Sequence, residues 1–257
     1  MIVQSRSFII GLALGATVLL ASGVETLAAQ ALVPRPAQQA ISHGSFRFPD
    51  NIDIALPLAT PRLREIATVL SGALSEAGIS SRVIVADSAP GGIVLQSGGP
   101  LHDESYRLTV SGEGISIVAQ GDAGALWGVQ TLRQLVLGAE SRTLAAMQIV
   151  DAPRFEWRGS MIDVSRHFFP VDYLIYHLEW MSRHKLNVMH WHLTDDQGWR
   201  LQVDAHPRLT TVGAWRNEDR AGGARYGGYY TKADVRRVVE HARKLGITVV
   251  PEIELPG

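Results

Sequence analysis

Apolar and polar positions between residues 32 and 152 follow two different periods. Five short runs have the β-rich composition and spacing of strands: IDIAL, SRVIVAD, GIVLQS, SYRLTV and GISIVAQ. Two other segments, 61–77 and 122–138, repeat apolar residues at helical spacing, and a glycine marks the end of each. The pattern predicts a small α+β domain. Its polar residues are scattered, so we expect it to be non-catalytic.

In residues 153–257, the predicted elements are longer, and strand patterns alternate with helix patterns. The predicted strands are SMIDVS, NVMHWHL and ITVVPEIEL. A helical pattern separates the first two strands. A second helical pattern starts at the capping-box-like pair Thr231 and Asp234 and precedes the third strand. This alternation predicts parallel strands in βαβ units.

A long segment from Gln197 to Gly228 interrupts this alternation. It is longer than an ordinary connection between a strand and a helix, and it is rich in tryptophan, arginine and glycine. We therefore expect this excursion to serve the function of the protein as well as to link two elements.

Charged and histidine side chains occur at the end of each of the three predicted parallel strands. They are Arg166, His167, His190, His192, Asp195, Asp196, Glu252 and Glu254. Ligands of parallel α/β folds bind at the carboxyl ends of the strands, because the loops there converge on an open face. Each residue taken alone could cap a helix or turn a loop, but their shared position predicts a functional rim.

Composition and charge narrow the class of function. The 257 residues are 46% hydrophobic and 19% charged, which is typical of a globular protein. The formal net charge is −1 and no block of lysine or arginine is present, so we expect no nucleic-acid binding. The sequence contains no cysteine, which excludes disulfides, thiolate metal ligands and a cysteine nucleophile.

Residues 1–31 have the pattern of a secretory signal. Arg6 precedes the apolar run FIIGLALGATVLLASGV, which is followed by the small-residue stretch TLAAQA. Glycine and serine interrupt the run, and it is short for a membrane-spanning helix, so we expect no stable membrane anchor. We expect the protein to be exported to the periplasm or the extracellular space.

The rim residues allow several kinds of chemistry. His190 and His192 lie two positions apart on a strand and point to one face, where they could bind a metal ion or form a hydrogen-bonded core layer. Asp195 and Asp196 could be the paired carboxylates of a glycosidase, or a cap and its solvated neighbour. The guanidinium of Arg166 could donate two hydrogen bonds, either to two sugar hydroxyls or to one carboxylate. Five of the six tryptophans lie in residues 153–257. Their rings could stack on the apolar faces of sugars or pack in a protein core.

Several long motifs in this region occur in a fixed order: WRGSMIDVSRHFFP, KLNVMHWHLTDDQGWR, HPRLT, GGYYTKADV and VVPEIELPG. They resemble the opening of the catalytic barrel of the β-N-acetylhexosaminidases, glycoside hydrolase family 20. Upstream, SYRLTV, GISIVAQ and GALWGVQTLRQL resemble the non-catalytic α+β domain of the same family. The resemblance implies an α+β amino-terminal domain at 32–152, followed at 153–257 by the first three strands of a (β/α)8 TIM barrel.

The resemblance also implies an activity. Members of this family are retaining exo-glycosidases that release terminal N-acetylglucosamine or N-acetylgalactosamine by substrate-assisted catalysis. The 2-acetamido oxygen of the substrate attacks the anomeric carbon, an aspartate stabilises the oxazolinium, and a glutamate protonates the leaving oxygen. The implied partners are amino-sugar glycosides such as chito-oligosaccharides and glycan termini, without a cofactor or a metal.

The same resemblance assigns roles to four rim residues. Arg166 matches the arginine that grips hydroxyls of the terminal sugar. Asp195 matches the aspartate that joins a hydrogen-bond relay to the catalytic glutamate, through a histidine that we expect to follow Gly257. His192 and Glu252 match motif positions whose side chains contact these groups and not the substrate.

The catalytic pair itself is not in the sequence. In the family it stands in a Gly-Gly-Asp-Glu setting, which does not occur in residues 1–257. We therefore expect the acid glutamate and the orienting aspartate to lie beyond Gly257, and the amino-terminal portion to be inactive by itself. Two alternatives stay open: a non-catalytic sugar-binding remnant, and a metal-dependent barrel hydrolase that uses His190 and His192.

Overall fold

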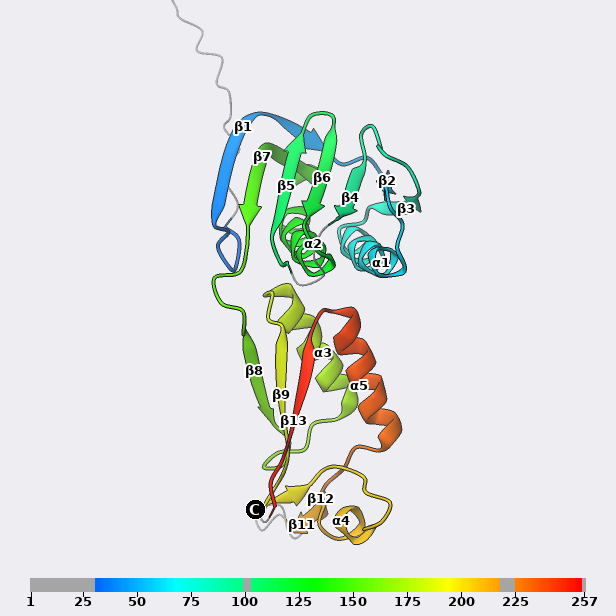
Figure 1. Ribbon diagram of the computed structural model, residues 1–257, viewed down its shortest axis with the longest axis vertical. Helices are drawn as coiled ribbons and strands as arrows, with labels where there is room; N and C mark the ends of the chain where they lie inside the picture. Colours follow the sequence, from blue (N-terminus) through cyan, green and yellow to red (C-terminus); the bar gives the residue numbers. More distant parts are fainter. Residues whose placement is uncertain (1–30, 99–102, 218–224, 256–257) are drawn as a thin grey trace, which may run out of the picture.

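The computed structural model describes residues 31–98, 103–217 and 225–255, which form two parts arranged along the long axis of the molecule (Figure 1). The predicted secretory signal lies outside the described residues, except for Ala31. None of the described helices is long and apolar enough to cross a membrane.

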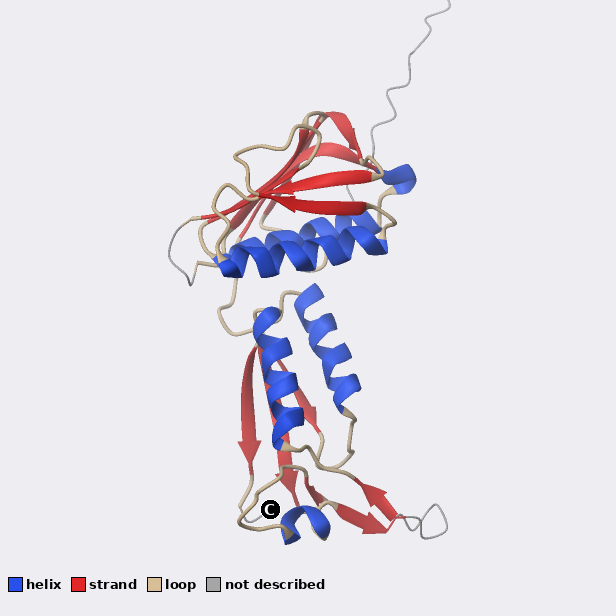
Figure 2. Ribbon diagram, turned by 90° about the vertical axis from the view of Figure 1, so that its right-hand side faces the viewer, coloured by secondary structure: helices blue, strands red, loops and turns tan. Residues whose placement is uncertain are grey.

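The first part is a seven-stranded mixed sheet with two long helices on one face (Figure 2). Its elements are β1 (Gln38–Arg47), β2 (Asn51–Ala55), α1 (Pro61–Glu76), β3 (Ser80–Ile84), β4 (Ile93–Ser97), β5 (Tyr106–Ser111), β6 (Gly114–Ala119), α2 (Asp122–Leu137), the 3-10 helix η1 (Glu140–Arg142) and β7 (Thr143–Asp151). The strand order is β1-β7-β5-β6-β4-β2-β3. Apolar side chains of α1, α2 and the covered face of the sheet form one core.

Helix α1 begins and ends where its sequence predicts. The side chain of Thr60 accepts a hydrogen bond from the backbone N–H of Leu63 at 3.1 Å, and Pro61 occupies the first turn, where no N–H is needed. Gly78 follows the helix with a φ of +71°, which glycine adopts without strain. The predicted apolar positions are buried, and each large side chain contributes about 2 kcal/mol.

Strands β1 and β7 were not predicted from the sequence. Most β1 side chains are exposed, because β1 lies at the edge of the sheet with β7 as its neighbour, so its sequence lacks a clear apolar alternation. Strand β7 lies between β1 and β5 and is mostly buried. Its sequence TLAAMQIVD is therefore a nearly continuous apolar run, whose periodicity does not separate strand from helix.

The second part is built around three parallel strands, with β9 between β8 and β13 (Figure 1). Its elements are β8 (Gly159–Asp163), α3 (Val171–Arg183), β9 (Val188–Asp195), β10 (Gly198–Trp199), α4 (Arg208–Thr211), β11 (Trp215–Asn217), β12 (Arg225–Gly227), α5 (Lys232–Lys244) and β13 (Thr248–Ile253). Helix α3 connects β8 to β9, and α5 precedes β13, so the predicted βαβ order is confirmed. The excursion between β9 and α5 contains β10, α4, β11 and β12.

The register of these strands determines where a site can form. His192 of β9 pairs with Asp163 of β8 on one side and with Glu252 of β13 on the other. Because the three strands are parallel, these residues meet at the same end of the sheet, near the carboxyl end of each strand.

A buried ion pair joins the two parts of the molecule. Lys185, just after α3, donates from Nζ to Asp151 Oδ2 at 2.7 Å and to the hydroxyl of Tyr106 at 2.8 Å. The side chains of Lys185 and Asp151 are only 8% and 11% exposed. Burial lowers the pKa of Lys185, and the Asp151 carboxylate counteracts this by favouring the charged amine. A hydrogen bond of 2.9 Å from Gln130 to Ser182 adds a second link.

Candidate active site

Side chains from β8, β9, β13 and their following loops meet around His192. Its Nδ1 forms a hydrogen bond with Glu252 Oε2. Its Nε2 lies 2.8 Å from Arg166 Nη1 and 3.0 Å from Asp195 Oδ2. The structure thus brings together Arg166, His192, Asp195 and Glu252, the four residues to which the sequence interpretation assigned a role.

Two groups of the predicted mechanism are not among the residues that meet here. The sequence interpretation placed the acid glutamate and the orienting aspartate beyond Gly257, and Gly257 itself lies outside the described residues. Their position therefore stays a prediction. The described part of the rim supplies the guanidinium of Arg166 and the carboxylate and imidazole groups around it.

The guanidinium of Arg166 is held from two directions. Its Nη1 donates to Asp163 Oδ2 at 3.1 Å, and its Nη2 forms an ion pair with Asp195 Oδ2 at 2.5 Å. The side chain of Arg166 is 51% exposed, whereas that of Asp195 is 14% exposed. Arg166 is therefore oriented by protein carboxylates while half of its side chain stays open to solvent.

Asp163 is a site residue that the sequence interpretation missed. Its Oδ1 accepts hydrogen bonds from the backbone N–H groups of Ser165 and Arg166, each at 3.0 Å. The sequence did contain a signal, because an aspartate at the end of a strand commonly accepts from N–H groups a few residues ahead. Asp163 therefore fixes both the backbone and the side chain of Arg166.

The electrostatics of the rim follow from these contacts. Burial lowers the pKa of His192, but hydrogen bonds to Glu252 and Asp195 outweigh burial and raise it above the ordinary 6.5. The backbone N–H of Asp196 lowers the pKa of Asp195 most strongly, and the hydrogen bond from His192 adds to this. The hydrogen bond from His192 also lowers the pKa of Glu252. The site therefore favours two ionised carboxylates beside a protonated imidazole.

The two neighbours of His192 Nε2 require different protonation states. Arg166 can only donate, so it bonds to Nε2 when this nitrogen carries no proton. The carboxylate of Asp195 can only accept, so it bonds to Nε2 when the nitrogen is protonated. Nδ1 faces the Glu252 carboxylate and donates in both cases. His192 can therefore change its partner at Nε2 by gaining or losing one proton.

The His190–His192 pair points to one face of β9, as the strand alternation predicts. His190 Nε2 lies 2.7 Å from Glu252 Oε2, the same oxygen that contacts His192. A metal ion bound to both histidines would replace the hydrogen bonds that these two nitrogens form with Glu252 Oε2. Among the described residues, the ligand atoms of His192, Glu252 and Glu254 lie within 4.8 Å of one another, and this group contains one histidine and two carboxylates without His190.

The tryptophans of this region lie in the core, in the excursion or near the amino ends of the strands. Trp191 is 1% exposed and belongs to the core. The indole N–H groups of Trp199 and Trp215 donate to backbone carbonyls of their own segment at 2.6 and 3.0 Å, so they stabilise the excursion. Trp157 and Trp180 are exposed, but they precede β8 and β9 and thus lie near the amino ends of these strands, away from the rim.

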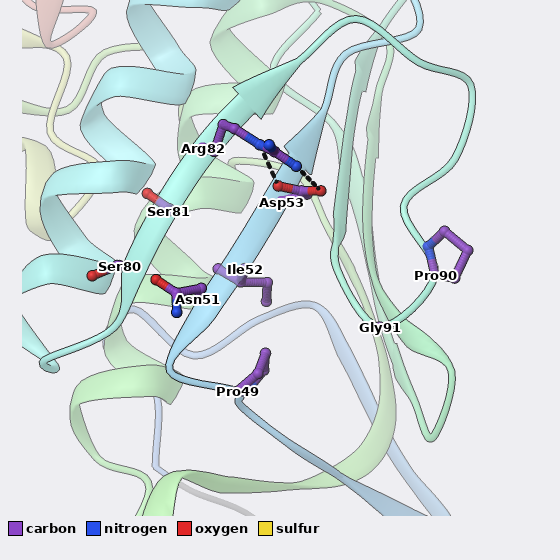
Figure 3. Close-up of a pocket in the computed structure, with 9 residues that line it drawn as sticks. All are labelled: Pro49, Asn51, Ile52, Asp53, Ser80, Ser81, Arg82, Pro90 and Gly91. Atoms are coloured by element: carbon purple, nitrogen blue, oxygen red, sulfur yellow. Dashed lines mark hydrogen bonds and ion pairs between the residues drawn. The ribbon is translucent and has the colours of Figure 1, made fainter.

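A hollow of about 670 Å³ lies in the first part, along β2, β3 and the loop before β4 (Figure 3). Its two charged lining residues, Asp53 and Arg82, bind each other through hydrogen bonds of 3.0 and 2.9 Å (Figure 3). None of its lining residues belongs to the rim. Because its charges are already paired, this hollow is a weaker candidate site than the rim.

Both parts of the chain match profiles of one family. Residues 29–152 match the description "Glycosyl hydrolase family 20, domain 2". Residues 155–257 match "Glycosyl hydrolase family 20, catalytic domain".

Relatives and solved structures resemble the chain over most of its length. The chain is 37% identical to the beta-hexosaminidase of Porphyromonas gingivalis over 88% of the chain and 30% of the relative. A structure of Streptomyces plicatus beta-hexosaminidase with the product GlcNAc is similar with a TM-score of 0.79 and 38% identity, over 88% of this chain and 46% of that one. A Vibrio harveyi exo beta-N-acetylglucosaminidase in complex with N-acetylglucosamine gives a TM-score of 0.78 and 34% identity, over 88% of this chain and 36% of that one.

The chain thus spans less than half the length of each of these proteins. The predicted fold class is confirmed: an α+β domain is followed by the first parallel strands of a (β/α)8 barrel. Since both parts match profiles of the same family and the solved neighbours share it, the chain belongs to glycosyl hydrolase family 20.

Proposed function

We propose that the protein hydrolyses terminal β-linked N-acetylhexosamine from amino-sugar glycosides such as chito-oligosaccharides and glycan termini. The names of its relatives support this, since they include beta-hexosaminidases and an N,N'-diacetylchitobiase. Two solved relatives also contain N-acetylglucosamine. Because the chain covers 30% of the Porphyromonas gingivalis relative, the proposal concerns the protein as a whole, to whose site these residues contribute.

The observation that carries the proposal is the fixed, half-exposed guanidinium of Arg166. A guanidinium presents five N–H donors in one plane, so a fixed one can fork onto two neighbouring sugar hydroxyls. Asp163 and Asp195 orient Arg166 before a ligand binds, which lowers the entropic cost of binding. We propose that Arg166 binds two hydroxyls of the terminal sugar.

The proposed reaction is substrate-assisted and retains the anomeric configuration. The 2-acetamido oxygen attacks the anomeric carbon as the bond to the leaving oxygen breaks, and water then opens the oxazolinium. This nucleophile is already bound beside the reacting carbon, so positioning supplies much of the rate enhancement. The Gly-Gly-Asp-Glu motif of the acid and the stabilising aspartate does not occur in residues 1–257, so we propose that this segment by itself is inactive.

Asp195 is proposed to act through its neighbours. Its carboxylate binds Arg166 and His192, and its lowered pKa keeps it ionised at neutral pH. It can therefore hold Arg166 in place while it takes part in the relay toward the acid. His192 and Glu252 extend this hydrogen-bonded network behind the sugar-binding face.

Kinetics of Arg166→Ala in the product of the intact reading frame that contains these residues test the assignment. We expect the wild type to hydrolyse 4-nitrophenyl N-acetyl-β-D-glucosaminide. The variant should lose roughly 100-fold in kcat/KM, because two charge-assisted hydrogen bonds worth about 1.5 kcal/mol each are removed. The control Arg237→Gln breaks an exposed pair with Asp172 and should stay within about twofold.

The wild-type assay also separates the alternatives. No turnover by the intact product would refute the proposed activity. Saturable binding of N-acetylglucosamine without turnover, lost in Arg166→Ala, would favour a non-catalytic sugar-binding protein. Stoichiometric zinc with turnover that a chelator abolishes would favour the metal-dependent hydrolase.

We also propose that the protein is exported to the periplasm or beyond, on the basis of the charged, apolar and small-residue order of residues 1–31. Mass spectrometry of the protein from its native host tests this proposal. A mature amino terminus near Ala31 in the exported fraction is the expected result. A chain that keeps Met1 and stays in the cytoplasm would contradict it.

A further inference from the structure

Three consecutive backbone carbonyl groups in the loop after β8 accept hydrogen bonds from arginines of the excursion between β9 and α5. Arg200 donates from Nε to the carbonyl of Val164 at 2.9 Å and from Nη2 to that of Ser165 at 2.7 Å. Arg216 donates from Nη2 to the carbonyl of Arg166 at 2.8 Å. The backbone that leads into Arg166 is therefore held by two side chains far ahead in the sequence.

Arg200 is wholly buried, and its hydrogen-bond partners in the described residues are carbonyl oxygens. Its Nη1 donates to the carbonyls of Ala214 and Gly228 at 2.5 and 3.2 Å. Burial lowers the pKa of Arg200, because the charged guanidinium loses its hydration. An apolar side chain would avoid this desolvation cost, but it could not bind carbonyls from three separate segments.

The backbone around Arg200 leaves room for the guanidinium only because glycines line it. A Cβ added at Gly198 would lie 2.4 Å from Arg200 Cζ. A Cβ added at Gly228 would lie 2.4 Å from the ring of Phe168, over which the guanidinium sits at 5.8 Å. The excursion and the Arg200 side chain therefore fit together as one unit.

A tyrosine of the excursion extends the same contact. The hydroxyl of Tyr226 accepts a hydrogen bond from the backbone N–H of Phe168 at 2.9 Å and lies 2.9 Å from His167 Nδ1. The guanidinium of Arg216 lies over the Tyr226 ring at 5.0 Å. The excursion thus holds the loop from position 164 to position 168.

We infer that Arg200 and Arg216 are positioning residues that fix the direction of Arg166 at the rim. The part of this inference that concerns sugar rests on the proposed function. Asp163 and Asp195 hold the end of the Arg166 side chain, whereas Arg200 and Arg216 hold the backbone from which it starts. A displacement of about 1 Å in a binding group can lower a rate by roughly 100-fold, so remote anchors of this kind affect catalysis without touching the substrate.

A double-mutant cycle with Arg166 in the intact protein tests the inference. Arg216→Gln is the main variant because Arg216 is half-buried, and Arg200→Lys, which keeps the charge, is the second. Arg216→Gln should lower kcat/KM about tenfold, mainly through KM, and should have no further effect in Arg166→Ala. The matched control is Arg225→Gln, since Arg225 also lies in the excursion and donates to a carbonyl, that of Thr211 at 2.9 Å, outside the loop.

Amide hydrogen exchange of residues 164–168 provides a readout that does not depend on activity. Arg216→Gln should speed this exchange about tenfold, and Arg225→Gln should leave it unchanged. Equal kinetic losses in both Arg166 backgrounds, or unchanged exchange, would overturn the inference. A wild type without hydrolysis, together with faster exchange in Arg216→Gln, would refute the proposed activity and keep the positioning role.

Discussion

Arg166 and Asp195 form an ion pair of 2.5 Å between Nη2 and Oδ2, which joins the loop after β8 to the end of β9. The same carboxylate oxygen lies 3.0 Å from His192 Nε2. One aspartate therefore orients the guanidinium that is proposed to bind the sugar and, together with Glu252, favours the charged form of the His192 imidazole. The two functions depend on a single atom, so they should change together when it is altered.

Asp195→Asn should lower the pKa of His192 toward its ordinary 6.5, because an amide removes one of the negative charges that favour the imidazolium. The shift of the His192 ring protons with pH, followed by NMR, measures this. Asp196→Asn is the control, because the contact of Asp196 with Asp195 is made by its backbone N–H. A His192 pKa that is the same in Asp195→Asn and in the wild type would contradict the site geometry.

The free energy of unfolding should fall as pH rises above 6.5. The folded-state pKa of His192 is raised, so its stabilisation is complete below the unfolded value of 6.5 and is lost as pH rises through the folded value. Urea unfolding at a series of pH values measures the slope, and His192→Gln should flatten it in this window. An unchanged slope in His192→Gln would show that another group causes it.

At acidic pH, the free energy of unfolding should fall as pH falls. The pKa values of Asp195 and Glu252 are lowered, so their contribution is present above their ordinary values of 3.8 and 4.5 and is lost as pH falls through the folded values. Urea unfolding of Glu252→Gln should show a weaker loss of stability in acid than the wild type. The same acid slope in both proteins would contradict this assignment.

Gly198→Ala should destabilise the protein by about 2 kcal/mol or more. The new Cβ would lie 2.4 Å from Arg200 Cζ, so the buried guanidinium must leave some of its carbonyl partners. Gly72→Ala is the matched control, because Gly72 lies in α1 with nothing within 4 Å of an added Cβ, and it should be neutral or stabilising by up to about 1 kcal/mol. Equal urea midpoints for the two variants would contradict the role given to Arg200.

Lys185→Met should destabilise the protein by about 3 kcal/mol, because it leaves the buried carboxylate of Asp151 without its cation. The double variant Lys185→Met/Asp151→Leu should regain part of this loss, since an apolar pair avoids the uncompensated charge. Urea unfolding measures both, with Lys244→Met as a control at an exposed lysine. A double variant as unstable as the sum of its single variants would contradict this account of the link between the two parts.

Local sequence signals predicted much of the fold. Thr231 and Asp234 form the predicted capping box, with Thr231 Oγ1 accepting from the Asp234 N–H at 3.1 Å and the Asp234 carboxylate accepting from the Thr231 N–H at 2.9 Å. Such a signal is complete within one helical turn. Strand β1 has no equivalent, because its partner β7 lies far along the chain, as the pairing of Gln38 with Val150 shows.

The residues of the site also fall into two groups, those that the sequence pattern predicts and those that it does not. The strand period and the parallel order were sufficient to predict that Arg166, His192 and Glu252 share one rim. Arg200 could not be assigned, because its acceptors lie 14, 28, 35 and 36 residues away and are backbone carbonyls. Every residue has such a carbonyl, so no side-chain pattern in the sequence marks the partners of Arg200.

The configuration of the first product tests the proposed reaction most directly. Proton NMR during hydrolysis of 4-nitrophenyl N-acetyl-β-D-glucosaminide by the intact protein distinguishes the two anomers of the released sugar. β-N-acetylglucosamine should form first, and the α-anomer should follow only by mutarotation, because two displacements at one carbon restore its configuration. Formation of the α-anomer first, or no release of N-acetylglucosamine, would contradict the proposed reaction.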